Sequence, residues 1–203
     1  LLLGVTVFFL ARVQASLYFM NNIADETIFN RARRQVLINA VPFVVLFLIF
    51  VGATLTADGY ELNPVNGEVF VRKYKYFFNL IEMPWVAVMF LIGVVSVLYA
   101  IIRAAFSKTW ICGIWYSGIG TVLVVLSLFF LAGYNNTPYY PSAVDLQSSL
   151  TIYNSSSSLF TLEVMTVVSF LVPFVLAYIV YAWRAMDKKP ITEQEMESGE
   201  HTY

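Results

Sequence analysis

Few residues in this chain could carry chemistry, and they lie far apart. The only histidine, His201, stands next to the C-terminus, where we expect solvent, whereas a haem or metal ligand needs a packed site. Without a second histidine there is no base for a nucleophilic triad, and no glycine-rich phosphate loop is present. The sequence therefore predicts no catalytic residue and no metal site, and it leaves cofactor-binding residues unknown.

The single cysteine, Cys112, lies within an apolar run. One cysteine excludes an internal disulfide framework and CxxC metal chemistry. Free cysteine usually behaves as a small apolar side chain. We therefore expect Cys112 to be a packing residue.

Arg12 is the one ionisable residue deep in an apolar segment. An intramembrane charge is a functional-site hypothesis, so Arg12 could line a polar cavity or pair with an acid elsewhere; it could also extend toward the interface. Glu82 and Glu163 stand at the expected outer starts of helices, where a carboxylate complements the helix dipole. Thr161 offers a hydroxyl cap for the same start as Glu163.

The composition is that of a membrane protein. Of the 203 residues, 59 % are hydrophobic and only 12 % are charged, about half the soluble average. The formal net charge of −1 argues against nucleic acid as a partner, because such binders carry a basic face. Lipid is the environment that this composition fits.

Five segments are long and apolar enough to cross a bilayer, which takes about 20 residues in a helix. Runs this long do not alternate as barrel strands do. We predict an all-α, polytopic integral membrane helical bundle, with residue 1 inside a transmembrane helix of a longer protein. The expected helices are 1–20, 36–56, 82–102, 110–133 and 162–183, with outer loops 57–81 and 134–161 and a polar tail at 187–203.

Lysine and arginine placement predicts the orientation, because cytoplasmic loops carry the excess of positive charge. One set of connections holds Arg31, Arg33, Arg34, Arg103, Lys108, Arg184, Lys188 and Lys189, and the other holds only Arg72, Lys73 and Lys75. The first set should therefore be cytoplasmic together with the tail. Loop 134–161, which has no lysine or arginine, should lie outside.

Small residues and tryptophans also fit a bundle. Gly113, Ser117 and Thr121 recur every four residues, as do Ser96, Ala100 and Ala104, and such stripes let helix backbones approach closely in lipid. The tryptophans at segment ends suit the headgroup level; they are Trp85, Trp110 and Trp183.

In loop 57–81, Asp58-Gly59 and Asn66-Gly67 are turn dipeptides, and the aromatic, basic stretch 70–79 could lie along the interface.

The loop 134–161 and the start of the following segment carry Pro141-Ser142, Ser149 to Asn154, Ser157-Ser158, and Thr161-Leu162 with Met165. The pattern is Pro-Ser, a Ser-Leu-Thr-aromatic-Asn segment, a Ser-Ser, and Thr-Leu-x-x-Met leading into the last helix. It resembles the pattern of subunit II of cytochrome bd-type quinol oxidases. Weaker similarity extends to Asp58-Gly59-Tyr60, Arg31 to Arg34 and Ile191-Thr192.

The resemblance implies a non-catalytic subunit of a bacterial plasma-membrane complex, which oxidises quinol, reduces dioxygen to water and generates a proton gradient. It implies that haem b, haem d and the quinol site belong to a larger subunit I, the main partner beside membrane lipids. This chain would be the C-terminal half of subunit II, supporting assembly and sometimes holding a structural quinone. The loop would close the outer end of the bundle, with its hydroxyls and amides bonded to its own backbone.

Two alternatives come from other classes. Half of a multi-pass transporter would show proline- or glycine-broken helices and midplane charges, but Pro42, Pro84 and Pro173 fall near the expected helix ends or in first turns. A structural or receptor-like bundle would leave Arg12 unexplained and predict sugar on Asn135 or Asn154, which lie in N-glycosylation triplets.

Overall fold

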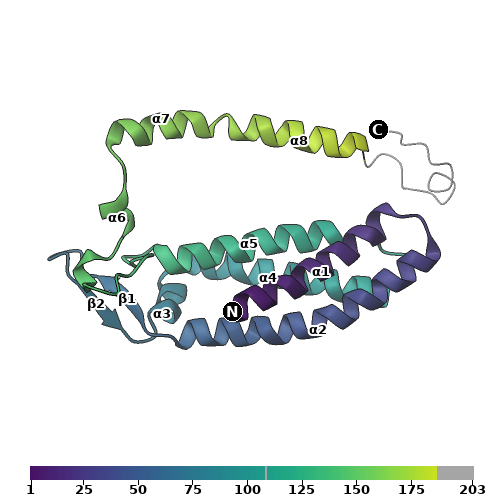
Figure 1. Cartoon of the computed structure of the whole chain (residues 1–203), viewed down its shortest axis with the longest axis horizontal. Coiled ribbons are helices and arrows are strands. Elements are labelled where there is room, and N and C mark those ends of the chain that lie inside the picture. Colours follow the sequence, from purple (N-terminus) through teal and green to yellow (C-terminus); the bar gives the residue numbers. More distant parts are fainter. Residues whose placement is uncertain (108, 187–203) are drawn as a thin grey trace.

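The computed structural model describes residues 1–107 and 109–186. Long helices α1, α2, α4 and α5 lie alongside one another, and short elements gather at one end (Figure 1). In chain order the elements are α1 (Leu2–Asn22), α2 (Glu26–Thr56), β1 (Gly59–Leu62), β2 (Val69–Arg72), α3 (Lys75–Glu82), α4 (Pro84–Phe106), α5 (Gly113–Gly133), a 3-10 turn (Leu146–Ser148), α6 (Ile152–Ser155), α7 (Leu159–Ser169) and α8 (Val172–Met186).

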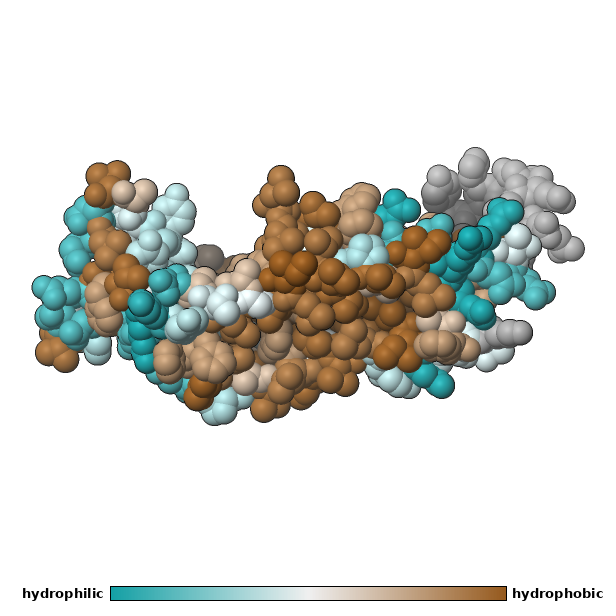
Figure 2. All heavy atoms as spheres, turned by 90° about the horizontal axis from the view of Figure 1, so that it is seen from below, coloured by the Kyte–Doolittle hydropathy of each residue, from teal (hydrophilic) through white to brown (hydrophobic). Residues whose placement is uncertain are grey.

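Five helical stretches in the described residues are long and apolar enough to cross a membrane, which confirms the predicted all-α polytopic bundle. They are Leu2–Asn22, Glu26–Thr56, Pro84–Phe106, Gly113–Gly133 and Leu159–Met186. Figure 2 shows the apolar surface as a broad central band, with hydrophilic residues gathered toward the two ends of the molecule. The distribution of apolar residues on the surface and the lengths of the helices therefore both indicate a membrane-spanning protein.

The second span begins ten residues earlier than predicted, at Glu26 instead of residue 36. Asp25 caps it, because its carboxylate accepts a 2.6 Å hydrogen bond from the Ile28 amide. Pro42, expected near a helix end, therefore lies well inside α2. Hydropathy detects only the apolar, lipid-facing part of a helix. The polar residue that caps the helix lies before that apolar part, so the predicted start was too late.

Two further boundary predictions were wrong, each with a consequence for a candidate residue. Glu82 ends α3 instead of starting the helix after it, which begins at Pro84. The fourth span begins at Gly113, so Cys112 precedes it as the N-cap and is exposed. Cys112 is therefore not a packing residue, since a position before the first helical turn faces the end of the bundle.

The last span, predicted as one helix over 162–183, consists of α7 and α8 with a break at Phe170 and Leu171. Pro173 follows the break directly, and proline has no N–H to continue the helical ladder. Neither helix has a buried residue. Figure 1 shows this span running beside the bundle and apart from it.

The bundle interior is packed through small side chains at the crossing of α4 and α5. A Cβ added to Gly120 would lie 2.7 Å from the Gly93 carbonyl oxygen, and one added to Gly93 would lie 2.8 Å from the Gly120 carbonyl oxygen. The predicted small-residue stripes contribute as well: Ala100, Ala104 and Ser117 are fully buried. Gly113 faces α1, because an added Cβ would lie 2.7 Å from Leu17.

We therefore expect Gly120→Ala to destabilise the protein by about 1–3 kcal/mol, as overpacking does. Gly118 is the matched control on the same helix, because a Cβ there meets nothing within 4 Å. Gly118→Ala should be neutral or slightly stabilising, since alanine favours helix. Thermal unfolding of the purified protein measures both, and equal midpoints for the two variants would contradict the close crossing of α4 and α5.

Candidate functional site

The end of the bundle opposite the α1–α2 connection is closed by a β-hairpin that the sequence interpretation missed. β1 and β2 pair antiparallel, from Gly59 opposite Arg72 to Leu62 opposite Val69. The turn between them contains Asn66-Gly67, and Gly67 adopts a φ of +74° that glycine accommodates without strain. The predicted turn at Asn66-Gly67 is thus confirmed, and the flanking residues form strands.

A buried ion pair joins this hairpin to α3. The Lys75 side chain is fully buried at the start of α3, and its ammonium lies 3.2 Å from the Glu61 carboxylate on β1. The same ammonium donates a 3.1 Å hydrogen bond to the Asn135 carbonyl. Burying a lone ammonium is strongly unfavourable, so Lys75 holds β1, α3 and residue 135 together.

Arg72 on β2 extends the charged group toward solvent. Its guanidinium donates to both Glu61 oxygens, at 3.1 and 3.0 Å, and lies 3.3 Å from Glu82. It also lies over the Phe78 ring, 4.6 Å from the centroid. The hydrogen bonds to Glu61, together with the charges of Glu61 and Glu82, raise the pKa of Arg72 above its ordinary value.

Asn79 supplies the neutral part of the same group and is fully buried. Its amide nitrogen donates to the Leu131 carbonyl at 2.9 Å and to the Thr137 hydroxyl at 2.8 Å, and its oxygen accepts from the Asn135 amide at 3.1 Å. Asn79 thereby satisfies the carbonyl of Leu131 in the last turn of α5, which has no partner within the helix.

These side chains together form what we term the hairpin polar cluster, which is made up of Glu61, Arg72, Lys75, Asn79, Glu82, Asn135 and Thr137. Two cations face two carboxylates, so the cluster is neutral as a whole. Its donors and acceptors bond one another and backbone carbonyls. This arrangement suits closure of the bundle end better than binding of an ion.

The segment after α5 folds largely on itself, as the sequence predicted. Ser149 is fully buried; its hydroxyl donates to the Leu146 carbonyl at 2.6 Å and accepts from the Ser142 amide at 3.1 Å. Thr151 and Asn154 form a capping box at the start of α6. The hydroxyls and amides of the Pro-Ser and Ser-Leu-Thr-Ile-Tyr-Asn patterns thus bond backbone, which confirms that expectation.

Two contacts tie this segment to the hairpin. Gln147 makes a paired contact with Val69, accepting from its amide at 2.9 Å and donating to its carbonyl at 3.0 Å. The Leu62 amide donates to the Asn136 carbonyl at 2.8 Å. Because Val69 and Leu62 belong to β2 and β1, the connections 57–81 and 134–161 form one polar cap.

The structure does not bring the predicted site residues together. Arg12 is exposed in the middle of α1, and Glu163 lies in the second turn of α7. The α7 cap is Ser158, whose hydroxyl accepts from the Thr161 amide, so the prediction of Thr161 as cap was wrong. His201 lies outside the described residues. Within residues 1–107 and 109–186, no three His, Cys, Asp or Glu side chains form a metal-binding group.

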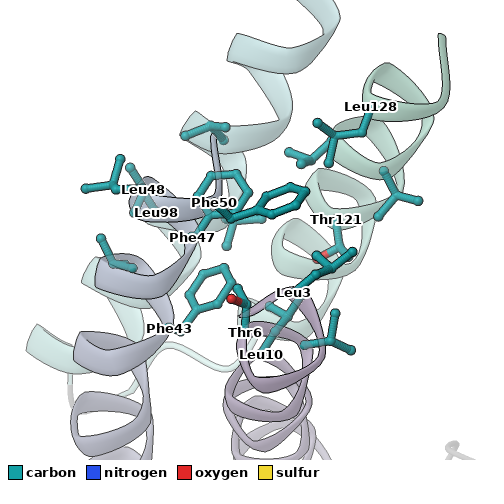
Figure 3. Close-up of a pocket in the computed structure, with 16 residues that line it drawn as sticks. Leu3, Thr6, Leu10, Phe43, Phe47, Leu48, Phe50, Leu98, Thr121 and Leu128 are labelled. Atoms are coloured by element: carbon teal, nitrogen blue, oxygen red, sulfur yellow. The ribbon is translucent and has the colours of Figure 1, made fainter. Parts of the chain in front are cut away.

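A cavity of about 100 Å³ lies inside the bundle, between α1, α2, α4 and α5. Figure 3 shows side chains from these helices converging on it, among them Phe43, Phe47 and Leu128. Its lining is apolar except for Thr6 and Thr121, and both hydroxyls donate to the carbonyl four residues earlier. The cavity therefore suits a hydrocarbon chain and offers no polar group to hold a head group.

The sequence carried one signal for the hairpin polar cluster. Asp58-Gly59 and Asn66-Gly67 bracket the first strand, and Val69-Phe70-Val71-Arg72 follows the second turn, a spacing typical of a hairpin. The burial of Lys75 and Asn79 could not be predicted, because α3 reads as an amphipathic helix. The aromatic stretch 70–79, expected along the interface, folds as β2 and α3 instead.

Replacing Lys75 with methionine should destabilise the cap by about 1–3 kcal/mol, because the Asn135 carbonyl loses its hydrogen-bond donor and the partly buried Glu61 keeps Arg72 as its one cationic partner. Lys73→Met is the matched control: Lys73 is exposed and has no ion pair among the described residues. We expect the control to change stability by less than about 0.5 kcal/mol. Thermal unfolding and proteolysis of loops 57–81 and 134–161 measure both effects. If Lys75→Met were as stable and resistant as Lys73→Met, the cluster would not hold the cap together.

Comparison with known proteins places the chain in a family. Residues 1–186 match the family described as "Cytochrome bd terminal oxidase subunit II". The chain is 28 % identical to "Cytochrome bd-I ubiquinol oxidase subunit 2" of Escherichia coli, over 100 % of this chain and 55 % of that protein. It is also 28 % identical to "Probable cytochrome oxidase subunit 2" of Haemophilus influenzae, over 79 % of this chain and 44 % of that protein.

The chain thus spans about half the length of the curated relatives it matches. The matched region includes the five spans and the connections 57–81 and 134–161. The family match covers more than nine tenths of the chain. It agrees with the resemblance that residues 141–165 carry. This chain belongs to the cytochrome bd terminal oxidase subunit II family.

Proposed function

We propose that the chain is part of the non-catalytic subunit II of a quinol oxidase complex and supports the assembly and stability of a haem-bearing subunit I. The family match over residues 1–186 carries this proposal. The complex would oxidise quinol at the outer face and reduce dioxygen to water with protons from the cytoplasm, generating a proton gradient. The name of the Escherichia coli relative, a ubiquinol oxidase subunit, supports quinol as the substrate class.

Residues 1–107 and 109–186 contain no histidine, and the donor set that the structure describes there does not fit a haem site. The sole histidine of the sequence is His201, and haem iron usually takes histidine, methionine or thiolate from a packed pocket. Met20 packs in the α1–α2 core and Met83 caps α4, and Cys112 is exposed at a helix start. The proposal accordingly assigns haem b and haem d to subunit I.

A structural quinone or lipid remains a second proposed ligand of the subunit. The apolar cavity lined by Phe43 and Phe47 has the chemistry for an isoprenoid or acyl chain. It has no free polar group for a quinone ring, because Thr6 and Thr121 bond their own helices. The cavity therefore supports a bound tail and gives no support to a ring site.

The transporter alternative gains nothing from the comparisons, although two prolines lie differently from what was expected. Pro42 is inside α2 and Pro173 follows the break between α7 and α8. Such features occur in transporters, but proline is tolerated in membrane helices generally. The oxidase family match outweighs them.

We further propose that the chain lies in the bacterial plasma membrane, with the bundle at 1–186, the hairpin polar cluster and loop 134–161 outside, and the tail 187–203 in the cytoplasm. The cytoplasmic end would carry Arg31, Arg33 and Arg34. At the opposite end, Lys75 and Arg72 are paired with Glu61. Pairing leaves little free positive charge there, which strengthens the charge argument for this orientation.

The complex itself is tested by purifying the tagged full-length gene product from native membranes in mild detergent. We expect a larger subunit to co-purify, with a reduced-minus-oxidised visible spectrum of b- and d-type haems and quinol-dependent oxygen uptake. An otherwise identical preparation from a strain without the tag is the control. Absence of a haem-bearing partner would overturn the proposed function.

The orientation is tested with a membrane-impermeant maleimide. Val65 stands at the hairpin tip, 92 % exposed, and Cys112 is exposed at the other end of the bundle. In spheroplasts we expect label on Val65→Cys, made in a Cys112→Ser background, and none on native Cys112. Inverted vesicles should give the reverse pattern, and labelling of Cys112 from outside would contradict the proposed orientation.

A further inference from the structure

Arg12 is an isolated charge at mid-depth in the membrane. It is ten residues from each end of α1, about 15 Å along the axis. The contact with α5 gives the same depth. Gln14 donates a 2.8 Å hydrogen bond to Thr121, which lies twelve residues, about 18 Å, before the end of α5. Arg12 is two residues nearer that end than Gln14, so it lies roughly 15 Å below the end of α5, too deep for an arginine side chain to reach water by extension.

The direction of the side chain also argues against extension to the cytoplasmic interface. Side chains on a helix lean toward its N-terminus, and the Arg12 guanidinium lies over the Phe8 ring, 5.7 Å from the centroid. Phe8 is one turn closer to the start of α1. The charge therefore points away from the cytoplasmic end of the helix.

No carboxylate among the described residues lies within ion-pairing distance of Arg12. The described spans contain only Glu26, at the first residue of α2, and Glu163, near the start of α7. Arg12 is exposed on a face of α1 that also presents Ala11 and Ala15. Small residues on such a face allow the backbone of a second helix to come close.

We propose that this face of α1 is an intramembrane helix–helix interface whose occupant is a transmembrane helix carrying an aspartate or glutamate at the depth of Arg12. We assign that helix to the region of a full-length subunit II that these 203 residues do not span. The relatives are about twice as long as the matched segment, and a helix of the same polypeptide is held at high effective concentration. The inference relies on the proposed function only for the existence of this region.

The interface is tested in the full-length complex with Arg12 intact. A photo-crosslinking amino acid at Ala15, one turn from Arg12, should give a crosslinked peptide from the unmatched region, within about one helical turn of an aspartate or glutamate. The same label at Val122, exposed on the neighbouring α5, is the control and should not give this peptide. Crosslinks to subunit I, to lipid alone or to a peptide without an acid would each overturn the proposal.

Charge reversal gives an independent readout. Arg12→Glu should lower the yield of assembled, haem-containing complex by at least about tenfold, because two carboxylates would then face each other in lipid. Changing the crosslinked acid to arginine in the Arg12→Glu variant should restore most of that yield, whereas Arg12→Lys should retain it. Normal assembly of Arg12→Glu, or no rescue by the reversed partner, would overturn the inference. Loss of haem from the wild-type complex would instead count against the proposed function.

Discussion

The absence of water from the hydrocarbon core is the constraint on which the structure depends. Every backbone amide and carbonyl at that depth must find a partner inside its own helix, and long uninterrupted helices are the result. Most hydroxyl side chains within the spans follow the same constraint. The hydroxyls of Thr6, Ser96, Thr121 and Ser127 each donate to the carbonyl four residues earlier. The Ser117 hydroxyl, which is fully buried at the packed face of α5, has no hydrogen-bond partner among the described residues.

Where the spans end, the constraint is relaxed and polar groups collect. The hairpin polar cluster joins β1, β2, α3 and the end of α5 through the buried Lys75 and Asn79 and the partly exposed side chains paired with them. Removing one partner of a buried group leaves the other desolvated, so the cluster depends on all its members. It gives this end of the bundle one defined shape, which segment 134–158 contacts through Gln147 and Asn136.

The described residues leave broad apolar faces uncovered. The last span has no buried residue, and α1 exposes a charge in the middle of its length. The interior, by contrast, is closed by small residues such as Gly93 and Gly120. The proposed roles of α1 and of the whole subunit follow from these faces.

The sequence alone determined the fold class, the number of spans and the family. Apolar runs of about 20 residues report lipid contact directly, and the Pro-Ser and Ser-Leu-Thr patterns are local, since each hydroxyl bonds backbone a few residues away. The sequence interpretation did not predict the helix starts, the hairpin or the exposure of Cys112. These features depend on caps and turns, which hydropathy does not detect. Only the tertiary structure decided that Lys75 and Asn79 are buried. Their partners Glu61 and Asn135 lie 14 and 56 residues away in the chain, and pairing over such separations depends on how the helices pack.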